Sequence, residues 1–251
     1  MIVSVDTGKQ TVNADGKEMP LYSRESFELL SRLWLKVGWN QKHTYTFSWL
    51  GMPIIQLPED MIRYQELVVA LRPDVIIETG VAHGGSLVFS ASLCALLKKG
   101  RVIGIDIATR PVNRERIQSH PMAQHISLVD GDSTSPEVVA EVGKHIRPGD
   151  VVLAVLDSNH SYAHVLAELY AYAPLVTKGS YIVATDGIMK DLTDVPRGQK
   201  EWNTDNPENA AADFARNNPD FILEEPPWPF NESELEVRVT HWPGAYLKRI
   251  R

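Results

Sequence analysis

Residues 75–106 read VIIETGVAHGGSLVFSASLCALLKKGRVIGID, and this stretch decides the fold class. The apolar, β-branched run Val75–Ile77 leads into a glycine-rich turn. A mostly apolar helical run follows at Ser86–Lys98, and a second strand follows at Val102–Ile105. Two parallel strands need a crossover connection, which is usually a helix. This order therefore predicts a βαβ unit with a polar turn at the carboxyl end of its first strand.

The same alternation continues toward residue 186. Short apolar runs predict further strands at Ile126–Val129, Val151–Leu156 and Tyr181–Ala184. Helices are predicted at Arg114–Ser119, Pro136–His145 and His160–Ala173. Strands that are apolar on both faces and alternate with helices predict an α/β fold with a doubly wound, mostly parallel sheet covered on both sides.

The residues before this unit predict an N-terminal helical extension. Apolar residues recur at near-helical spacing over Ser23–Val37 and again after Pro58. The aromatic, proline-containing segment Tyr45–Met61 is typical of an ordered loop or a short edge strand. We therefore expect a helical extension over residues 1–72, packed on a single domain over residues 73–251.

The residues after Asp186 form a long polar loop over positions 186–207. Loops of this length in a compact domain are often functional lids. Beyond the loop, the sequence predicts a helix at Glu208–Asn217 and strands at Phe221–Glu224, Glu236–Trp242 and Tyr246–Ile250.

The composition is that of one large globular domain with a small-molecule ligand. The chain has 251 residues, of which 43% are hydrophobic and 23% are charged. A formal net charge of -7 argues against a nucleic-acid partner, because nucleic-acid affinity depends mainly on Lys and Arg. The N-terminus has no basic stretch followed by an apolar one, and no run approaches about 18 apolar residues, so we expect a cytoplasmic protein without a membrane partner. The single cysteine, Cys94, excludes an intramolecular disulfide and is expected to be buried in a helix.

The glycine-rich turn after the first strand is a candidate ligand site. Gly80 and Gly84 lack Cβ atoms, so the backbone can approach a ligand closely there. Asp106 ends the second strand, 21 residues after Gly85 (106 − 85), near the offset of the acid that binds a ribose hydroxyl in dinucleotide folds. These residues together indicate an adenosine-containing ligand. Glycines that only form the turn are the alternative.

A dinucleotide is not the expected ligand. Gly80 and Gly84 lie four residues apart, whereas the dinucleotide fingerprint is G-x-G-x-x-G. Glu78, just before the first glycine, would repel a pyrophosphate and favour a ligand with cationic groups. The third strand leads into Asp132 and Ser133, polar groups where an adenine edge would lie, although both are also ordinary turn formers.

Two further acids end the fourth and fifth predicted strands. If these strands are neighbours, Asp157 and Asp186 start from backbones about 5 Å apart and can share one divalent cation. Hard oxygen ligands suit Mg²⁺ or Mn²⁺ better than Zn²⁺. His160, three residues after Asp157, could act as a base beside that cation, and His164 is expected to be a packing residue. The alternative is that one acid caps a helix and the other is a solvated turn residue.

At this point the chain resembles the cephalosporin hydroxylase family of S-adenosylmethionine-dependent O-methyltransferases, which is related to rhamnosyl and macrolide sugar O-methyltransferases. The resemblance runs from about Tyr45 to Gly187, and its motifs are WLGMPIIQLPEDM, YQELVVALRPDVIIETGVAHGGS, GIDI, LDSNHS and ATDG. It implies a Rossmann-like class I methyltransferase fold with a seven-stranded sheet. It also implies a saccharide acceptor and self-association through the N-terminal helices.

The resemblance also implies roles for individual residues. Those on the methionine and ribose side of the cofactor would be Glu78, Gly80, Gly84, Ser86 and, on the ribose itself, Asp106. Asp157 and Asp186 resemble the metal aspartates, and His160 resembles the general base of the sugar-methylating relatives. One position departs from the pattern, because many relatives have Glu-Asp where this chain has Thr185-Asp186. A lost carboxylate is expected to weaken the metal site unless Thr185 or water takes its place.

Three other functions remain to be distinguished. An NAD(P)-dependent oxidoreductase is disfavoured by the glycine spacing. A non-haem iron oxygenase would need two His and one carboxylate, and the chain has no H-x-D/E pair. A catalytically silent cofactor-binding scaffold is suggested by Thr185. Three tryptophans are candidate stacking surfaces for a sugar, namely Trp49, Trp202 and Trp228.

Overall fold

A seven-stranded sheet forms the centre of the molecule in the computed structural model, which describes residues 1–251. Five strands run parallel: β6 (Val75–Thr79), β7 (Arg101–Asp106), β8 (Ile126–Asp130), β9 (Val152–Leu156) and β10 (Tyr181–Ala184). The other two are β11 (Phe221–Leu223) and β12 (Tyr246–Arg249), and β12 pairs antiparallel with both β10 and β11. The strand order is β11-β12-β10-β9-β6-β7-β8. The predicted mostly parallel α/β sheet is therefore confirmed.

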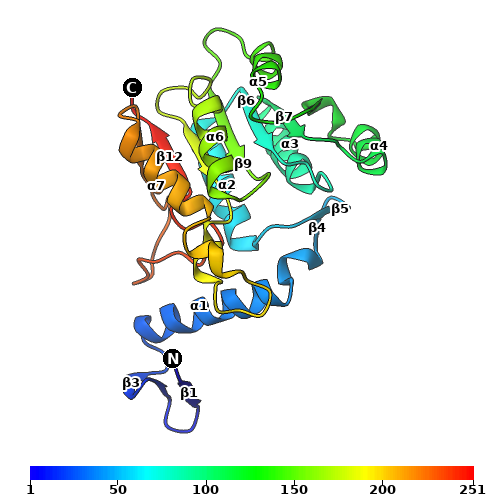
Figure 1. Ribbon diagram of the computed structural model, residues 1–251. Coiled ribbons are helices and arrows are strands. Elements are labelled where there is room, and N and C mark those ends of the chain that lie inside the picture. The colour runs from blue at the N-terminus through cyan, green and yellow to red at the C-terminus, as the bar shows by residue number, and fades with distance from the viewer.

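Helices cover both faces of this sheet (Figure 1). They are α2 (Pro58–Leu71), α3 (Gly85–Leu97), α4 (Pro111–Ser119), α5 (Pro136–Gly143), α6 (Tyr162–Tyr172) and α7 (Pro207–Asn217). One apolar core joins the sheet to α2 and α3, and a second joins its other face to α5, α6 and α7. Cys94 lies in the first core, as predicted. No helix is both long and apolar enough to cross a membrane.

The strand order predicts where a ligand would bind. The chain leaves β6 toward β7 and β8, then returns to place β9 on the other side of β6. In open α/β sheets, ligands bind at the carboxyl ends of the strands where the order reverses in this way. The strand order therefore predicts a ligand beside the residues that follow β6 and β9, which are the glycine-rich turn and Asp157.

The first residues of the chain are not helical, contrary to the predicted extension over residues 1–72. They form a small antiparallel sheet of β1 (Val3–Asp6), β2 (Thr11–Ala14) and β3 (Lys17–Pro20). Figure 1 shows this sheet beyond α1 (Arg24–Asn40), away from the central sheet. Asp15 and Gly16 join β2 to β3 with φ of 47° and 88°, as in a type I′ hairpin turn. The Asp-Gly pair was the sequence signal for this hairpin.

The remaining segments are partly as predicted. Residues 45–61 contain a short hairpin of β4 (Phe47–Trp49) and β5 (Met52–Ile54). The polar loop after β10 contains two short 3₁₀ helices, Gly187–Asp191 and Lys200–Asn203, and it packs on α1 and Leu57 through Ile188 and Leu192. The predicted strand at Glu236–Trp242 is wrong. That segment forms no strand and is held instead by α2, because Asp60 accepts hydrogen bonds from Thr240 and from the His241 backbone.

Candidate metal and cofactor site

The carboxyl ends of three adjacent strands bring the predicted acids together. β9 lies between β6 and β10 and is parallel to both. Asp157 follows β9 directly, and its backbone N–H donates to the Thr79 carbonyl at 3.0 Å. Asp186 follows β10 after Thr185. The prediction that these two acids end neighbouring strands is confirmed.

Asp157, His160 and Asp186 form a compact cluster. One ligand atom from each of the three side chains lies within 4.8 Å of the others. His160 Nε2 is 3.4 Å from Asp186 Oδ2, and neither acid has a Lys or Arg partner within ion-pair distance. His160 lies before α6, which begins at Tyr162, so the predicted helix start at His160 is two residues early (162 − 160). A loop position lets the imidazole turn toward Asp186.

The charges of this cluster favour a bound cation. Burial, followed by the nearby charge of Asp186, raises the pKa of Asp157 to about 7. Two carboxylates held together without a Lys or Arg partner are costly, and a divalent cation between them removes that cost. Two carboxylates also match the ligands that Mg²⁺ and Mn²⁺ use while keeping positions for water or substrate. Asp157 and Asp186 therefore fit the predicted divalent metal.

Two hydrogen bonds hold the Asp157 carboxylate in place. Gln56 Nε2 donates to Oδ2 at 2.9 Å, and the Thr185 hydroxyl donates to Oδ1 at 2.6 Å. Thr185 is fully buried, so it acts on the site by orienting Asp157, not as an exposed replacement for a carboxylate. The sequence reasoning missed Gln56. The only signal was its place inside the motif WLGMPIIQLPEDM, and that motif gave it no role.

The glycines of the turn after β6 are required by close packing. Gly80 has φ +88°, and a Cβ atom there would lie 2.0 Å from the Asp157 carbonyl oxygen. Gly84 has φ +84°, and its Cβ would lie 2.5 Å from the Ile117 side chain. Asp106 fixes the turn from the neighbouring strand, because its Oδ2 accepts the Val81 N–H at 3.0 Å. The packing role of Gly80, Gly84 and Asp106 does not exclude the predicted contacts of these residues with a ligand.

Gly80→Ala is expected to destabilise the protein far more than Gly179→Ala. Gly179 has nearly the same φ, +87°, but nothing lies within 4 Å of its hypothetical Cβ. Gly179→Ala should therefore cost only the left-handed backbone penalty of about 1–2 kcal/mol. Gly80→Ala adds a backbone clash worth roughly another 1–3 kcal/mol. Urea unfolding of both variants measures the difference, and equal losses would show that the Asp157 carbonyl is not pressed against Gly80.

Glu78 lines a small cavity beneath the turn. Its side chain is 2% exposed, and burial raises its pKa to about 8, with the Ser86 hydroxyl acting in the opposite direction. Glu78 Oε1 and Trp242 Nε1 both lack a hydrogen-bond partner and line a cavity of about 20 Å³. That volume holds about one water molecule. The cavity therefore has room for one water molecule beside these two polar atoms.

Asp132 and Ser133 lie on the loop after β8, with different surroundings. Asp132 is exposed, and its Oδ1 accepts from the backbone and hydroxyl of Thr134. The Ser133 hydroxyl is buried and donates to Glu168 Oε1 at 2.5 Å. Its side chain thus points into α6, so any contact of Ser133 with an adenine would come from the backbone.

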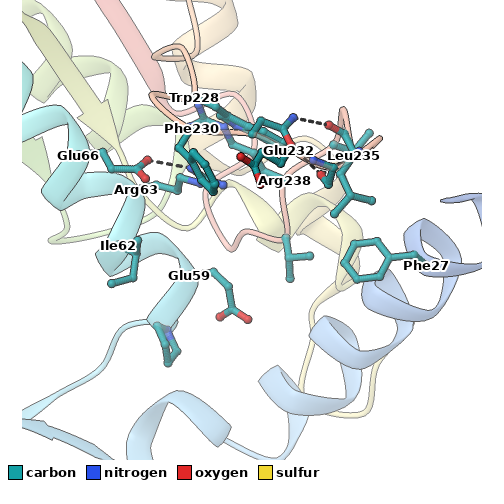
Figure 2. Close-up of a pocket in the computed structure, with 15 residues that line it drawn as sticks. Phe27, Glu59, Ile62, Arg63, Glu66, Trp228, Phe230, Glu232, Leu235 and Arg238 are labelled. Carbon is teal, nitrogen blue, oxygen red and sulfur yellow. Dashed lines mark hydrogen bonds and ion pairs between the residues drawn. The ribbon is translucent and has the colours of Figure 1, made fainter.

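The three tryptophans differ in their surroundings. Trp49 donates to the Ser92 hydroxyl at 3.1 Å, and Trp202 packs edge-on against Trp39. Only Trp228 lines a large cavity, of about 660 Å³, between α1, α2 and the C-terminal segment (Figure 2). The Arg63 guanidinium lies 4.7 Å from the centre of its ring. None of the predicted catalytic, metal or cofactor-binding residues lines this cavity.

Asp60 should make the protein without ligands less stable as the pH rises. Burial raises its pKa from 3.8 to about 8, so between these values the folded state binds more protons than the unfolded state. The stabilisation is complete below pH 4 and is lost as the pH approaches 8, at up to about 1.4 kcal/mol per pH unit.

Asp60→Asn tests this dependence, because asparagine resembles the neutral acid. The free energy of unfolding of the variant, measured in urea with a chelator, should fall less steeply than that of the wild type between pH 5 and 8. The exposed acid Asp191, changed to Asn, serves as control. Parallel curves for Asp60→Asn and the wild type would contradict the expectation.

Comparisons with known proteins agree with these features. The family model described as Rhamnosyl O-methyltransferase/CmcI matches residues 41–250. A rhamnosyl O-methyltransferase of Mycobacterium leprae is 31% identical over 155 residues, which cover 61% of this chain and 65% of that protein. One of Mycobacterium tuberculosis H37Rv is 32% identical over 144 residues, covering 55% and 56%. The chain thus spans less than two thirds of the curated relatives it matches.

Solved structures share the fold at lower identity. CmcI with Mg-SAM has a TM-score of 0.52 and 19% identity, and the match covers 82% of this chain and 78% of that one. MycE in complex with Mg, SAH and Mycinamycin VI has a TM-score of 0.51 and 18% identity, covering 86% and 54%. These likenesses support the arrangement of sheet and helices described above.

Proposed function

Because the chain belongs to the Rhamnosyl O-methyltransferase/CmcI family, we propose that it is an S-adenosylmethionine-dependent O-methyltransferase that requires Mg²⁺ or Mn²⁺. The acceptor would be a hydroxyl of a sugar or of a glycosylated small molecule. The observation that carries the proposal is the cluster of Asp157, His160 and Asp186 beside the glycine-rich turn, with ligand atoms within 4.8 Å of one another.

The cation would be held by Asp157 and Asp186, and it would supply Lewis acidity toward the acceptor hydroxyl. Gln56 and Thr185 keep Asp157 oriented through their hydrogen bonds to its two oxygens. His160 takes the proton of the acceptor hydroxyl on an imidazole nitrogen, at the open side of the cluster. Both acids must stay ionised for these roles. A bound cation would offset the raised pKa of Asp157 and would so keep its carboxylate ionised.

The methyl donor would lie across the carboxyl ends of β6, β7 and β8. S-adenosylmethionine supplies a methyl group on a positively charged sulfur. Acids line its proposed path: Glu78 on the methionine side, Asp106 on the ribose, and Asp132 near the adenine. Gly80, Gly84 and Ser86 would line the methionine and ribose side of the donor, while the loop of Ser133 would form the far wall of the adenine site.

The names of the relatives support a saccharide acceptor. The mycobacterial relatives are named rhamnosyl O-methyltransferases, and the MycE complex contains Mycinamycin VI. Self-association through the N-terminal helices belongs to the same proposal. It is supported by three large apolar side chains that α1 leaves exposed, namely Phe27, Trp34 and Val37.

Calorimetry with S-adenosylhomocysteine and with NAD tests the donor class first. We expect S-adenosylhomocysteine to bind and NAD not to bind, since the glycine spacing does not fit a pyrophosphate. Methyl transfer from S-adenosylmethionine to a panel of sugars and glycosides is then measured with Mg²⁺ and with a chelator. Binding of S-adenosylhomocysteine without cation-dependent transfer to any acceptor would favour the silent scaffold, and binding of NAD alone would favour an oxidoreductase.

A further inference from the structure

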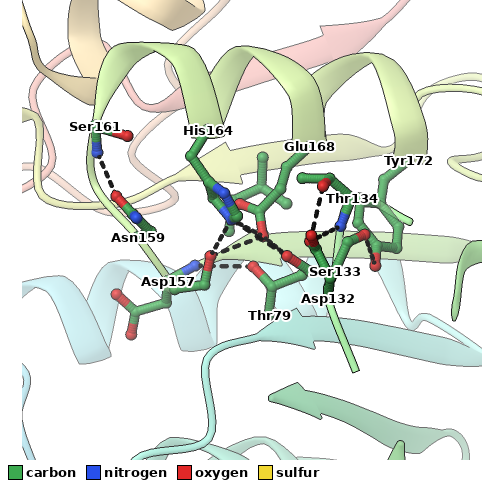
Figure 3. A network of polar contacts seen from close by, with 12 residues as sticks. Thr79, Asp132, Ser133, Thr134, Asp157, Asn159, Ser161, His164, Glu168 and Tyr172 are labelled. Atoms are coloured by element: carbon green, nitrogen blue, oxygen red, sulfur yellow. Dashed lines mark hydrogen bonds and ion pairs between the residues drawn. The ribbon is translucent and has the colours of Figure 1, made fainter. Parts of the chain in front are cut away.

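A polar stripe runs along the inner face of α6. His164, Glu168 and Tyr172 are spaced by four residues, so their side chains lie on one side of the helix. Figure 3 shows this side facing the loops that follow β8 and β9. Glu168 is fully buried, which is unusual for a carboxylate unless it has a specific partner. The stripe lies behind the proposed site and contributes no ligand to it.

Glu168 joins the two loops through one oxygen. Its Oε1 accepts from the Ser133 hydroxyl at 2.5 Å and from the Ser158 hydroxyl at 2.7 Å. Ser133 belongs to the loop proposed to border the adenine, and Ser158 stands directly after Asp157 in the metal loop. Tyr172 also fixes the loop that contains Ser133, because its hydroxyl donates to the Ser133 carbonyl at 2.8 Å.

The hydrogen atoms in this network can be assigned. Each serine has one hydroxyl hydrogen, and both are donated to Glu168. His164 Nε2 lies 3.1 Å from Ser158 Oγ, 3.3 Å from Ser133 Oγ and 3.3 Å from Glu168 Oε1. With both serine hydrogens donated to Glu168, any hydrogen bond of Nε2 to this group is one that it donates. His164 is therefore a further link between the loops, in addition to packing on them.

The hydrogen bond from Ser158 to Glu168 fixes the direction of the metal loop, residues 157–161. Within residues 157–161, Ser158 turns toward α6, whereas His160 turns toward Asp186. Asn159 closes the bend by accepting the Ser161 N–H at 2.9 Å. Without the Ser158 anchor, the loop after Asp157 would lose its fixed direction, and His160 would lose its orientation relative to Asp157, which Gln56 and Thr185 still hold.

We propose that Glu168 is a positioning residue that couples binding of the methyl donor to binding of the divalent cation. This inference rests on the proposed function, because the two loops border the donor and the cation only if that function holds. A donor that orders the Ser133 loop also fixes Glu168, and Glu168 then fixes Ser158 and the metal loop. Coupling of this kind is reciprocal, so each ligand must tighten the other by the same factor.

Calorimetry measures this factor without any turnover. The affinity for S-adenosylhomocysteine is measured with and without Mn²⁺, and the affinity for Mn²⁺ with and without S-adenosylhomocysteine. In the wild type each ligand should tighten the other by at least about 5-fold. In Ser158→Ala and Glu168→Ala the factor should fall close to 1. Glu168→Gln keeps an acceptor oxygen for both serines and should retain most of the coupling.

Ser161→Ala is the matched control for Ser158→Ala. It lies in the same loop, and its hydroxyl makes no cap hydrogen bond, so the coupling factor should stay at the wild-type value. Should Glu168→Ala fail to fold, Ser158→Ala alone decides, since it removes only one hydroxyl. A wild type that binds both ligands independently, or a Ser158→Ala variant with wild-type coupling, would overturn the inference. A wild type that binds no S-adenosylhomocysteine would instead refute the proposed function, and the inference with it.

Discussion

Asp186→Asn should lower cation-dependent turnover by at least about 100-fold while leaving S-adenosylhomocysteine affinity near the wild-type value. Asp186 has φ of 58°, in the left-handed region, which asparagine tolerates well among residues with a side chain. The substitution therefore keeps the backbone and the size of the side chain and removes only the charge. With one carboxylate gone, the remaining donors bind a hard divalent cation much more weakly.

Titration of Mn²⁺ by electron paramagnetic resonance separates this effect from a folding defect. The affinity of Asp186→Asn for Mn²⁺ should fall together with turnover. Asp191→Asn removes the same charge five residues further along (191 − 186) from an exposed position, and it should bind Mn²⁺ like the wild type. If Asp186→Asn kept wild-type Mn²⁺ affinity, Asp186 would not hold the cation.

The central sheet could be predicted because its strands are apolar on both faces. Val75, Ile76 and Ile77 are completely buried, and the helices between the strands alternate with them along the chain. The family implied by the motifs is confirmed by the match over residues 41–250. Consecutive parallel strands also predicted that Asp157 and Asp186 end at one edge of the sheet.

One predicted strand failed because the structure of its segment depends on a distant partner. Residues 236–242 alternate like a strand, but β11 and β12 pair with each other and leave no free edge beside β12. Asp60 then holds the segment by hydrogen bonds to Thr240 and His241, 180 and 181 residues away in the chain. No local pattern reports such a contact.

The supporting residues of the site were hidden for the same reason. Gln56 reaches Asp157 across 101 residues, and Glu168 reaches Ser133 across 35. The sequence shows that Thr185 stands where many relatives have a carboxylate, but it does not show that the Thr185 hydroxyl contacts Asp157. Thr185 was therefore interpreted only as a lost carboxylate. Charged residues at strand ends can be predicted from topology, whereas the groups that orient them require the packed structure.

His160→Ala should reduce turnover by about 100- to 10,000-fold, the usual contribution of a general base. Affinity for S-adenosylhomocysteine should stay near the wild-type value, since His160 lies on the cation side of the cluster. His125→Ala is the control. His125 immediately precedes β8, at the amino end of the parallel strands, and its removal should leave turnover unchanged. Turnover equal to the wild type in His160→Ala would remove His160 from the reaction.

Mn²⁺ affinity then decides how His160 acts. One nitrogen lone pair cannot both bind a cation and accept a proton, so the two roles predict different results. If His160 is the base, His160→Ala binds Mn²⁺ normally, and saturating cation does not restore turnover. If His160 is instead a third ligand, Mn²⁺ affinity falls, and excess cation recovers part of the rate. Added imidazole can replace either a missing base or a missing ligand, so Mn²⁺ affinity, and not rescue by imidazole, separates the two roles.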